Sequence, residues 1–336
     1  MKVLFDHPSP FFLAHGGFQT QIEQTKVALE AIGVPVEYVR WWDEGQNGGI
    51  IHYFGRPVAG YIEFAHRKGI RVVLAELLTG TGSRGGLARR LQRMLIRATQ
   101  AFVPRAFYYR MGWESYRLAD ACVAGTPWEK KLMVEMFDAS PEKVHCIPIG
   151  VGMEFLESTA TARSPWLVCT ATITPRKRVL ELAEAAVEAQ TPTWIIGKPY
   201  AGDDEYARQF ESFARNNPRF IRYNGAITDR KQLAAAYREA RGFVLLSTME
   251  SLSLSSFEAA ACGCPLLLSD LPWARSTFDH HASYCPVRFS RQGTARILRR
   301  FYDAAPDLPA PPKPQTWPEM ARELAKLYER LPSTSR

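Results

Sequence analysis

Short apolar runs of strand type alternate along most of the chain with segments in which apolar residues recur every three or four positions. In the first half, strand-like runs lie at residues 2–5, 34–39, 49–54, 71–75 and 120–124, and helical patterns lie at 18–32, 58–68 and 127–137. Gly33 ends the first of these helices. Because alternating strands and helices form parallel sheets with crossover helices, this half predicts an α/β domain.

The second half repeats the alternation. Strands are expected at 166–171, 193–197, 220–223, 243–246 and 266–269, with helices at 178–190, 203–216, 229–240, 255–262 and 290–303. Pro and Gly at 147–152, followed by a polar run at 157–164, indicate a linker. We expect domains at 1–152 and 153–305. A proline-stiffened segment at 304–314 is long enough to return a last helix, 316–331, to the first domain.

A serine-rich turn between the strand at 243–246 and the helix at 255–262 is the first candidate site. Glu250 and Glu258 bracket it, with seven residues between them, and its serines are Ser251, Ser253, Ser255 and Ser256. A strand that leads to a helix N-terminus forms an anion site, because free N–H groups and the helix dipole point at the ligand. The alternative is a plain helix with a serine N-cap.

Two further features suit phosphate. Arg176, Lys177 and Arg178 lie between the first strand and first helix of the second domain. Since ligands of open α/β sheets bind at the carboxyl ends of the strands, we expect all three cations at the same sheet edge as Glu250 and the serine-rich turn, where a diphosphate needs them. Gly16-Gly17, just before the helix at 18–32, is a second place where backbone can approach a phosphate.

Gly80-Thr-Gly-Ser-Arg-Gly85 matches G-x-G-x-x-G. A dinucleotide fingerprint normally follows the first strand and has an acidic residue about 20 positions later. Here the motif follows the fourth strand and position 105 is Arg. We therefore expect a flexible glycine loop near the interdomain cleft, and an NAD-dependent oxidoreductase that uses Gly80–Gly85 is the alternative.

The segment 84–117 contains eight arginines and one acid, Glu114. Its helical part has Leu87, Leu91, Met94, Leu95 and Ala98 on one side and Arg89, Arg90, Arg93 and Arg97 largely on the other. Two interpretations stay open: a membrane or acceptor surface, and a solvated basic face over a core. Aromatic residues follow among further arginines, but no nucleic-acid-binding motif accompanies them, so we expect no nucleic-acid partner.

Composition limits the class of protein. At 336 residues, with 46% hydrophobic and 23% charged residues and a net charge of +8, the chain predicts a globular protein of two domains. Neither a transmembrane run nor a secretory signal is expected. The six cysteines lack metal-site spacing, so we expect reduced structural thiols in a cytoplasmic protein, with peripheral contact to the inner membrane face through 84–117 as an additional expectation.

The stretch Ser247-Thr-Met-Glu-Ser-Leu-Ser-Leu-Ser-Ser-Phe-Glu-Ala-Ala-Ala-Cys-Gly-Cys-Pro265 resembles the E-x7-E region of the retaining glycosyltransferases of family 4. Members usually read Ser-x-x-Glu-Gly-Phe-Gly-Leu-x-x-x-Glu-Ala-x-Ala-x-Gly-x-Pro. Gly16-Gly17, Ile147-Pro-Ile-Gly-Val-Gly152, Ser269-Asp-Leu-Pro272 and the helix at 317–328 also fit the family. The resemblance therefore covers most of the chain.

This resemblance implies the GT-B fold: two Rossmann-like domains facing across a cleft, with the C-terminal helix crossing back to the first. It implies sugar transfer from a nucleotide-sugar with retention at the anomeric carbon, without metal or other cofactor, to an acceptor on the first domain, such as an anionic lipid or glycan. Glu258 would hold the ribose, Glu250 the donor sugar, Lys177 the diphosphate charge, and amides around Ser253 and Leu254 the phosphates.

Three positions depart from the family pattern. The family's Gly-Arg pair falls on Thr170-Ala171, so that arginine is absent, and Arg176 or Arg178 is its candidate substitute. Ser251 and Ser253 replace loop glycines. The family's histidine has no match in 74–79, where Glu76, Thr79 or His15 are the nearby candidates. A non-catalytic GT-B protein that binds a nucleotide-sugar is therefore the second hypothesis.

Overall fold

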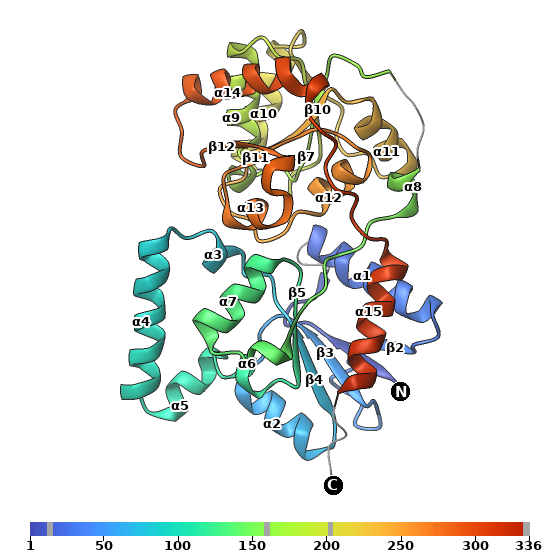
Figure 1. Cartoon of the computed structure of the whole chain (residues 1–336), viewed down its shortest axis with the longest axis vertical. Coiled ribbons are helices and arrows are strands. Elements are labelled where there is room, and N and C mark those ends of the chain that lie inside the picture. The colour runs from blue at the N-terminus through green and yellow to red at the C-terminus, as the bar shows by residue number, and fades with distance from the viewer. Residues whose placement is uncertain (12–15, 158–161, 201–203, 332–336) are drawn as a thin grey trace. The chain divides into compact units, whose positions relative to one another are not determined.

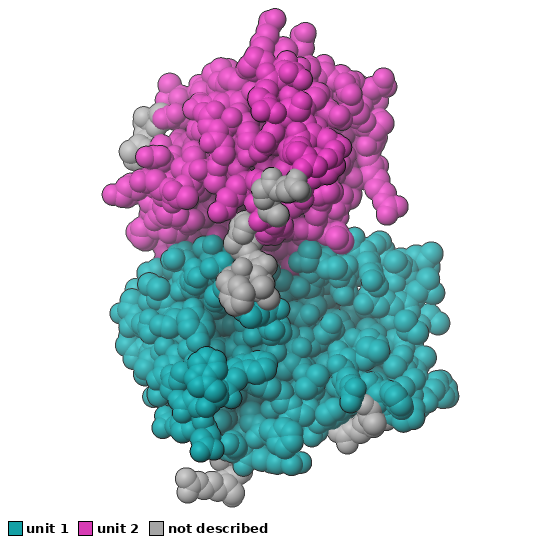
Figure 2. Space-filling model, turned by 180° about the vertical axis from the view of Figure 1, so that it is seen from behind, with its two compact units in different colours: residues 1–150, 317–336 teal, residues 151–316 magenta. Residues whose placement is uncertain are grey.

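The computed structural model of the protein describes residues 1–11, 16–157, 162–200 and 204–331. The chain forms two compact units (Figure 2). Unit 1 consists of Met1–Gly150 and Trp317–Arg336, and unit 2 consists of Val151–Thr316. The last helix, α15 (Trp317–Arg330), thus belongs to the same unit as the N-terminus, as the sequence predicts.

Unit 1 contains a parallel six-stranded sheet in the order β2-β1-β3-β4-β5-β6. Its strands are β1 (Val3–Asp6), β2 (Val36–Tyr38), β3 (Ile50–Phe54), β4 (Arg71–Ala75), β5 (Ala121–Ala124) and β6 (Val144–Cys146). Most residues of the central strands are buried, which explains their continuous apolar runs. Chain order reverses between β1 and β3, so the loop after β1 leaves the sheet at its switch point.

Helices surround this sheet (Figure 1). They are α1 (Gly17–Ala31), α2 (Ala59–Arg67), α3 (Thr79–Gly82), α4 (Gly86–Phe102), α5 (Arg105–Tyr108), α6 (Ser115–Leu118), α7 (Pro127–Phe137) and α15, with short 3₁₀ turns η2 (Tyr109–Met111) and η3 (Pro141–Lys143). Helices α1 and α15 pack together. The buried Tyr328 hydroxyl of α15 lies 2.5 Å from Nδ1 of His52 in β3, so His52 is a packed structural residue.

Unit 2 contains a second parallel six-stranded sheet, in the order β12-β11-β10-β7-β8-β9. Its strands are β7 (Leu167–Thr170), β8 (Thr193–Ile196), β9 (Ile221–Tyr223), β10 (Gly242–Leu245), β11 (Leu266–Ser269) and β12 (Ser283–Cys285). The edge strand β12 was not predicted, because three residues with only partial burial carry too little periodicity.

The helices of unit 2 follow the predicted alternation closely. They are α8 (Met153–Leu156), α9 (Val179–Glu188), α10 (Glu205–Asn216), α11 (Arg230–Glu239), α12 (Leu254–Ala261), α13 (Pro272–Phe278) and α14 (Arg291–Ala304), with 3₁₀ turns η4 (Pro175–Lys177), η5 (Asp279–His281) and η6 (Ala305–Asp307). Side-chain caps set several starts, including Asp204 for α10, Asp229 for α11 and Ser290 for α14. The short helices α8 and α13 were not predicted.

The glycine motif of residues 80–85 is not the flexible loop that we predicted. Gly80 and Gly82 belong to α3, and the Trp128 indole of α7 donates to the Gly82 carbonyl over 3.1 Å. A Cβ at Gly82 would approach that indole nitrogen to 3.2 Å, so this glycine allows α3 to pack against α7. The motif follows β4 rather than β1, which removes the strand context of a dinucleotide fingerprint.

Candidate functional site

The candidate site of unit 2 begins at the point where its chain order reverses. Strands β7 and β10 are parallel neighbours, yet the chain visits β8 and β9 between them. The loops after β7 and β10 therefore leave the same sheet edge side by side, which is where open α/β sheets bind ligands. One loop contains η4 with its basic residues, and the other contains Glu250 and leads into α12.

Glu250 forms ion pairs with two cations of the neighbouring loop. Arg176 Nη1 lies 2.8 Å from Glu250 Oε1, and Lys177 Nζ contacts the same oxygen. The Thr248 amide also donates to the Arg176 carbonyl over 2.8 Å, which ties the two loops together. Glu250 is buried, with 6% of its surface exposed. Two cations on one carboxylate leave a net positive charge at the sheet edge, which suits an anionic ligand.

Arg178 lies in the same loop at this sheet edge, as expected, but its guanidinium has a different partner. Its Nη1 donates instead to the Val287 carbonyl over 2.8 Å, beyond the end of β12. Arg178 has a φ of 53°, and this left-handed conformation turns the chain directly into α9. The reversal of direction separates its side chain from those of Arg176 and Lys177. Of the two candidate substitutes for the missing arginine, only Arg176 lies beside Glu250.

The serine turn forms the start of α12. Ser253 is its N-cap, and the Ser253 hydroxyl oxygen accepts from the Ser256 amide at 3.3 Å and from the Ser256 hydroxyl at 3.0 Å. Ser251 is fully buried. Leu254 and Ser255 lie in the first turn of α12. Their backbone N–H groups therefore have no carbonyl within the same helix to which they can donate a hydrogen bond. The positive end of the α12 dipole is thus directed toward the loop that carries Glu250.

Glu258 lies in a different network. Its side chain is 3% exposed, Arg230 Nη2 lies 2.8 Å from its Oε1, and the Tyr237 hydroxyl donates to its Oε2 over 3.5 Å. Burial raises the pKa of Glu258 to about 7, and Arg230 offsets only part of that rise. Arg230 Nε also lies 3.2 Å from Glu154 Oε1 of α8. The carboxyl group therefore changes charge near neutral pH.

Sequence reasoning missed Arg230, Tyr237 and Glu154. Arg230 and Tyr237 come from α11 and Glu154 from α8, so they meet Glu258 only because both helices pack against α12. No motif or spacing links these positions. The one available signal was the pair Arg230-Lys231 at the start of a predicted helix, and such a pair is an ordinary surface feature.

At the carboxyl edge of unit 1, the loop after β1 ends at Gly16, the N-cap of α1. Gly16 has a φ of 154°, which favours glycine, and Gly17 is the first helical residue. His15 lies outside the described residues. Glu76 directly follows β4, accepts from the Tyr116 hydroxyl, and has a pKa raised by burial. Thr79 starts α3.

The four arginines of α4 lie in different environments. Arg89 and Arg93 are partly covered, and the Arg89 guanidinium lies 4.6 Å from the centre of the Trp128 ring. Arg90 is exposed, and Arg97 Nη2 lies 3.6 Å from Asp138 Oδ1. The apolar side of the helix is exposed. The interpretation of α4 as a basic face over an apolar core is therefore wrong.

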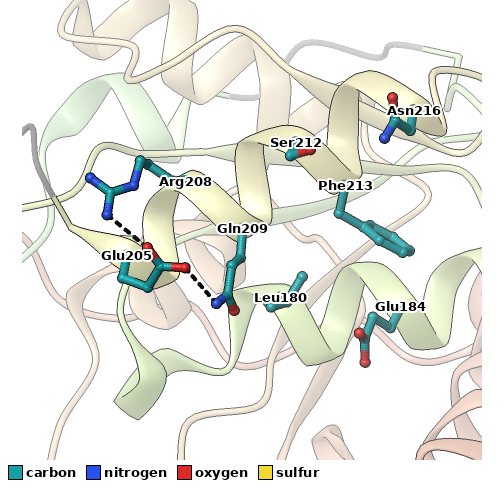
Figure 3. Close-up of a pocket in the computed structure, with 8 residues that line it drawn as sticks. All are labelled: Leu180, Glu184, Glu205, Arg208, Gln209, Ser212, Phe213 and Asn216. Atoms are coloured by element: carbon teal, nitrogen blue, oxygen red, sulfur yellow. Dashed lines mark hydrogen bonds and ion pairs between the residues drawn. The ribbon is translucent and has the colours of Figure 1, made fainter.

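One hollow on unit 2 is lined by other residues. It has a volume of about 510 Å³ between α9 and α10, and Figure 3 shows Leu180 and Phe213 facing it, with an ion pair of 2.7 Å between Glu205 and Arg208 at one end. Glu184, Gln209, Ser212 and Asn216 complete its lining. None of the predicted site residues lines this hollow.

Comparison with known proteins matches residues 164–299 to the family described as "Glycosyl transferases group 1". D-inositol 3-phosphate glycosyltransferase from Jonesia denitrificans is 29% identical over 189 residues, a match that covers 48% of this chain and 44% of that protein. The chain thus spans less than half the length of this curated relative. The matched family segment includes Arg176, Lys177, Glu250 and Glu258.

Solved structures show the fold. Sucrose-phosphate synthase from Thermosynechococcus elongatus has a TM-score of 0.67 at 16% identity and covers 98% of this chain and 99% of its own. HepE of Anabaena, solved in complex with UDP and glucose, has a TM-score of 0.63 at 14% identity, over 98% of this chain and 100% of its own. The fold is GT-B, with two Rossmann-like units, as predicted. Over residues 164–299, the family match shows similarity to the group 1 glycosyl transferases.

Proposed function

We propose that the protein transfers a sugar from a nucleotide-sugar to an acceptor with retention at the anomeric carbon and without a metal ion, as the family 4 enzymes that it resembles do. In the net reaction, the bond from the anomeric carbon to the diphosphate oxygen breaks, and the electron pair stays on the diphosphate. The acceptor oxygen bonds to the same face of the anomeric carbon, and its proton passes to the released diphosphate or to solvent. The residues of unit 2 would bind the donor.

The observation that carries this proposal is the pairing of Glu250 with Arg176 and Lys177 at the switch point of the unit 2 sheet. A diphosphate would compete with Glu250 for these two cations. Glu250 would then be able to accept hydrogen bonds from the donor sugar. The cations would also offset the charge that develops on the leaving diphosphate, which is the work a metal ion does in other transferases.

Glu258 and the start of α12 would bind the other parts of the donor. The ionised Glu258 carboxylate can accept two hydroxyl groups of a ribose, and Tyr237 and Arg230 fix its orientation. Amides at Leu254 and Ser255, together with the helix dipole, suit the phosphates. We also expect the backbone at Gly16 and Gly17 of unit 1 to contact the donor.

Equilibrium binding of UDP-, GDP- and ADP-sugars, followed by calorimetry, tests the donor site. Lys177→Gln removes one cation of the Glu250 cluster, and Arg178→Gln is its matched control, because the adjacent side chain is bound to the Val287 carbonyl. We expect Lys177→Gln to weaken binding by about tenfold or more, since a charge-assisted contact contributes about 1.5–3 kcal/mol. Arg178→Gln should bind nearly as the unchanged chain does.

The proposal would be contradicted if the chain bound none of these donors and Glu258→Ala behaved in the same way as the unchanged chain. Turnover is measured as donor hydrolysis or transfer in the presence of EDTA, and NMR coupling constants of the product report the anomeric configuration. An inverted product, or activity lost with EDTA, would refute retention or metal independence separately from donor binding.

A second candidate function is nucleotide-sugar binding without catalysis. It is favoured by the absence of the family arginine at Thr170-Ala171 and by Glu76, whose carboxylate is bound to Tyr116 and Arg56 rather than available. This hypothesis predicts thermal stabilisation by a donor with no release of nucleotide diphosphate. The acceptor, and a cytoplasmic location, stay predictions from the sequence.

A further inference from the structure

Helix α4 presents its apolar side to solvent. Leu87, Leu91, Met94, Leu95 and Phe102 have between 58% and 86% of their surfaces exposed. At about 100° of rotation per residue, these five side chains form one continuous stripe along the helix. Ile96, on the opposite side, is the only buried residue that α4 contributes. A surface helix normally buries such a stripe, so its exposure calls for a partner.

The orientation of the helix is fixed by contacts on its inner side. Ile96 packs into the core of unit 1, Arg89 stacks on Trp128, and Gln92 and Arg93 are partly covered. Rolling α4 over to bury its leucines would expose Ile96 and break the Arg89 stack. The exposed stripe is therefore a stable feature of unit 1.

The apolar surface continues beyond the helix. Phe107 and Met111 are 69% and 52% exposed, and they follow α4 in α5 and η2, where Figure 1 shows the chain turning back at the far end of α4. Cations border this surface. Arg90 and Arg97 lie along one edge of the stripe by helical rotation, and Arg84 and Arg110 are exposed near its two ends.

We propose that α4 together with Phe107 and Met111 lies in the interface of an anionic lipid membrane, with the apolar stripe inserted below the headgroups. The charge around the stripe favours an anionic membrane over a second copy of the chain. The segment 84–117 contains eight arginines and one acid, whose carboxylate is paired with Arg117 at 3.1 Å. A second copy docked through the same stripe would place two strongly basic borders against each other. Anionic headgroups instead supply the opposite charge, and acyl chains cover the stripe.

The dimensions of α4 fit this placement. A helix of 17 residues is about 25 Å long, and it would lie along the membrane plane. No helix within residues 1–11, 16–157, 162–200 and 204–331 is long and apolar enough to cross a membrane. Insertion of the apolar stripe and contact of the arginines with headgroups contribute separately to the free energy of membrane binding. Salt weakens the attraction between arginines and anionic headgroups, but it does not weaken the burial of the leucines.

The test is flotation of the full chain with vesicles of phosphatidylcholine alone and with about 30% phosphatidylglycerol, at low and high salt. We expect binding to the anionic vesicles that weakens at high salt without vanishing. Leu91→Glu with Leu95→Glu should lower the partition coefficient by about tenfold or more. Val27→Glu with Phe64→Glu is the matched control, since it places the same charges at two other exposed apolar positions of unit 1 and should lower it far less.

Arg90→Gln with Arg97→Gln separates the two contributions, because it should reduce binding to anionic vesicles while leaving any binding to neutral vesicles unchanged. Light scattering after gel filtration is run on the same samples. The proposal is wrong if the leucine variant floats as the unchanged chain does, if the unchanged chain binds neither vesicle, or if it is a dimer that the leucine variant dissociates. Donor binding is measured in parallel, and it should be the same in all three variants, so failure here leaves the proposed function intact.

Discussion

Glu258→Gln is predicted to stabilise unit 2 at alkaline pH and to leave it nearly unchanged at acidic pH. Burial raises the pKa of Glu258 from its usual value of 4.5 to about 7 in the folded protein. Between these two pH values the folded state keeps a proton that the unfolded state releases. The free energy of unfolding therefore falls as pH rises through this window, and the loss is complete above pH 7.

The size of the effect follows from the width of the window. One pKa unit corresponds to about 1.4 kcal/mol, so the ionisation of Glu258 destabilises the fold by about 3 kcal/mol over the whole window. Glutamine has nearly the same shape and cannot ionise. At pH 5 the variant should lie within about 1 kcal/mol of the unchanged chain, and at pH 8 it should be more stable by about 2–3 kcal/mol.

Thermal unfolding of both chains at pH 5, 6, 7 and 8 and constant ionic strength measures how their stability difference changes with pH. For a unit of this size, the melting temperature of the variant should rise by about 5–10 °C relative to the unchanged chain between pH 5 and 8. The difference between the two chains is the quantity to follow, because buried His52 in unit 1, with a pKa lowered to about 3, makes that unit less stable as pH falls.

Glu205→Gln is the matched control for this experiment. Glu205 is exposed on α10, and its hydrogen bond to Arg208 lowers its pKa, so it stays ionised from pH 5 to 8. The stability difference of this variant should be constant over that range. A constant difference for Glu258→Gln as well, or a Glu258→Gln chain that is less stable at pH 8, would refute the view that Glu258 is an ionisable group held in a desolvated place.

Two further substitutions test the packing around the sites. Gly197→Ala would place a methyl group 1.8 Å from the Ala171 carbonyl oxygen, so we expect a loss of more than about 3 kcal/mol in unfolding free energy and weaker donor binding, as the β7–α9 loop is displaced. Gly80→Ala, with open space around its Cβ, should cost far less, and equal losses in denaturant titrations would contradict the argument. Tyr328→Phe leaves Nδ1 of buried His52 without its hydroxyl partner and should lower the unfolding free energy of unit 1 by about 1–3 kcal/mol. An unchanged melting temperature would show that this contact contributes nothing to holding α15 on unit 1.

The two proposals together suggest where an acceptor would be found. If α4 lies at an anionic membrane surface, an acceptor carried by a lipid would be presented at the same surface as unit 1. That combination predicts higher transfer rates on vesicle-bound acceptors than on the same acceptors in solution.

The sequence by itself determined the α/β alternation, the return of α15 to unit 1 and the start of α12 within the serine-rich turn. These features depend on interactions between neighbours in the chain: apolar periodicity, a serine cap and the proline-rich segment before Trp317. The same local logic brought Arg176, Lys177 and Glu250 to one sheet edge, because parallel strands end together.

Only the tertiary structure decided which partners these residues have. Arg178 turns away because its left-handed backbone reverses direction, and Arg230 meets Glu258 because two helices distant in sequence pack together. It also decided which side of α4 is covered. An amphipathic pattern shows that a helix has two unlike sides, but the side that faces the protein depends on what packs there, and in α4 that is Ile96 and the Arg89–Trp128 stack rather than the leucines.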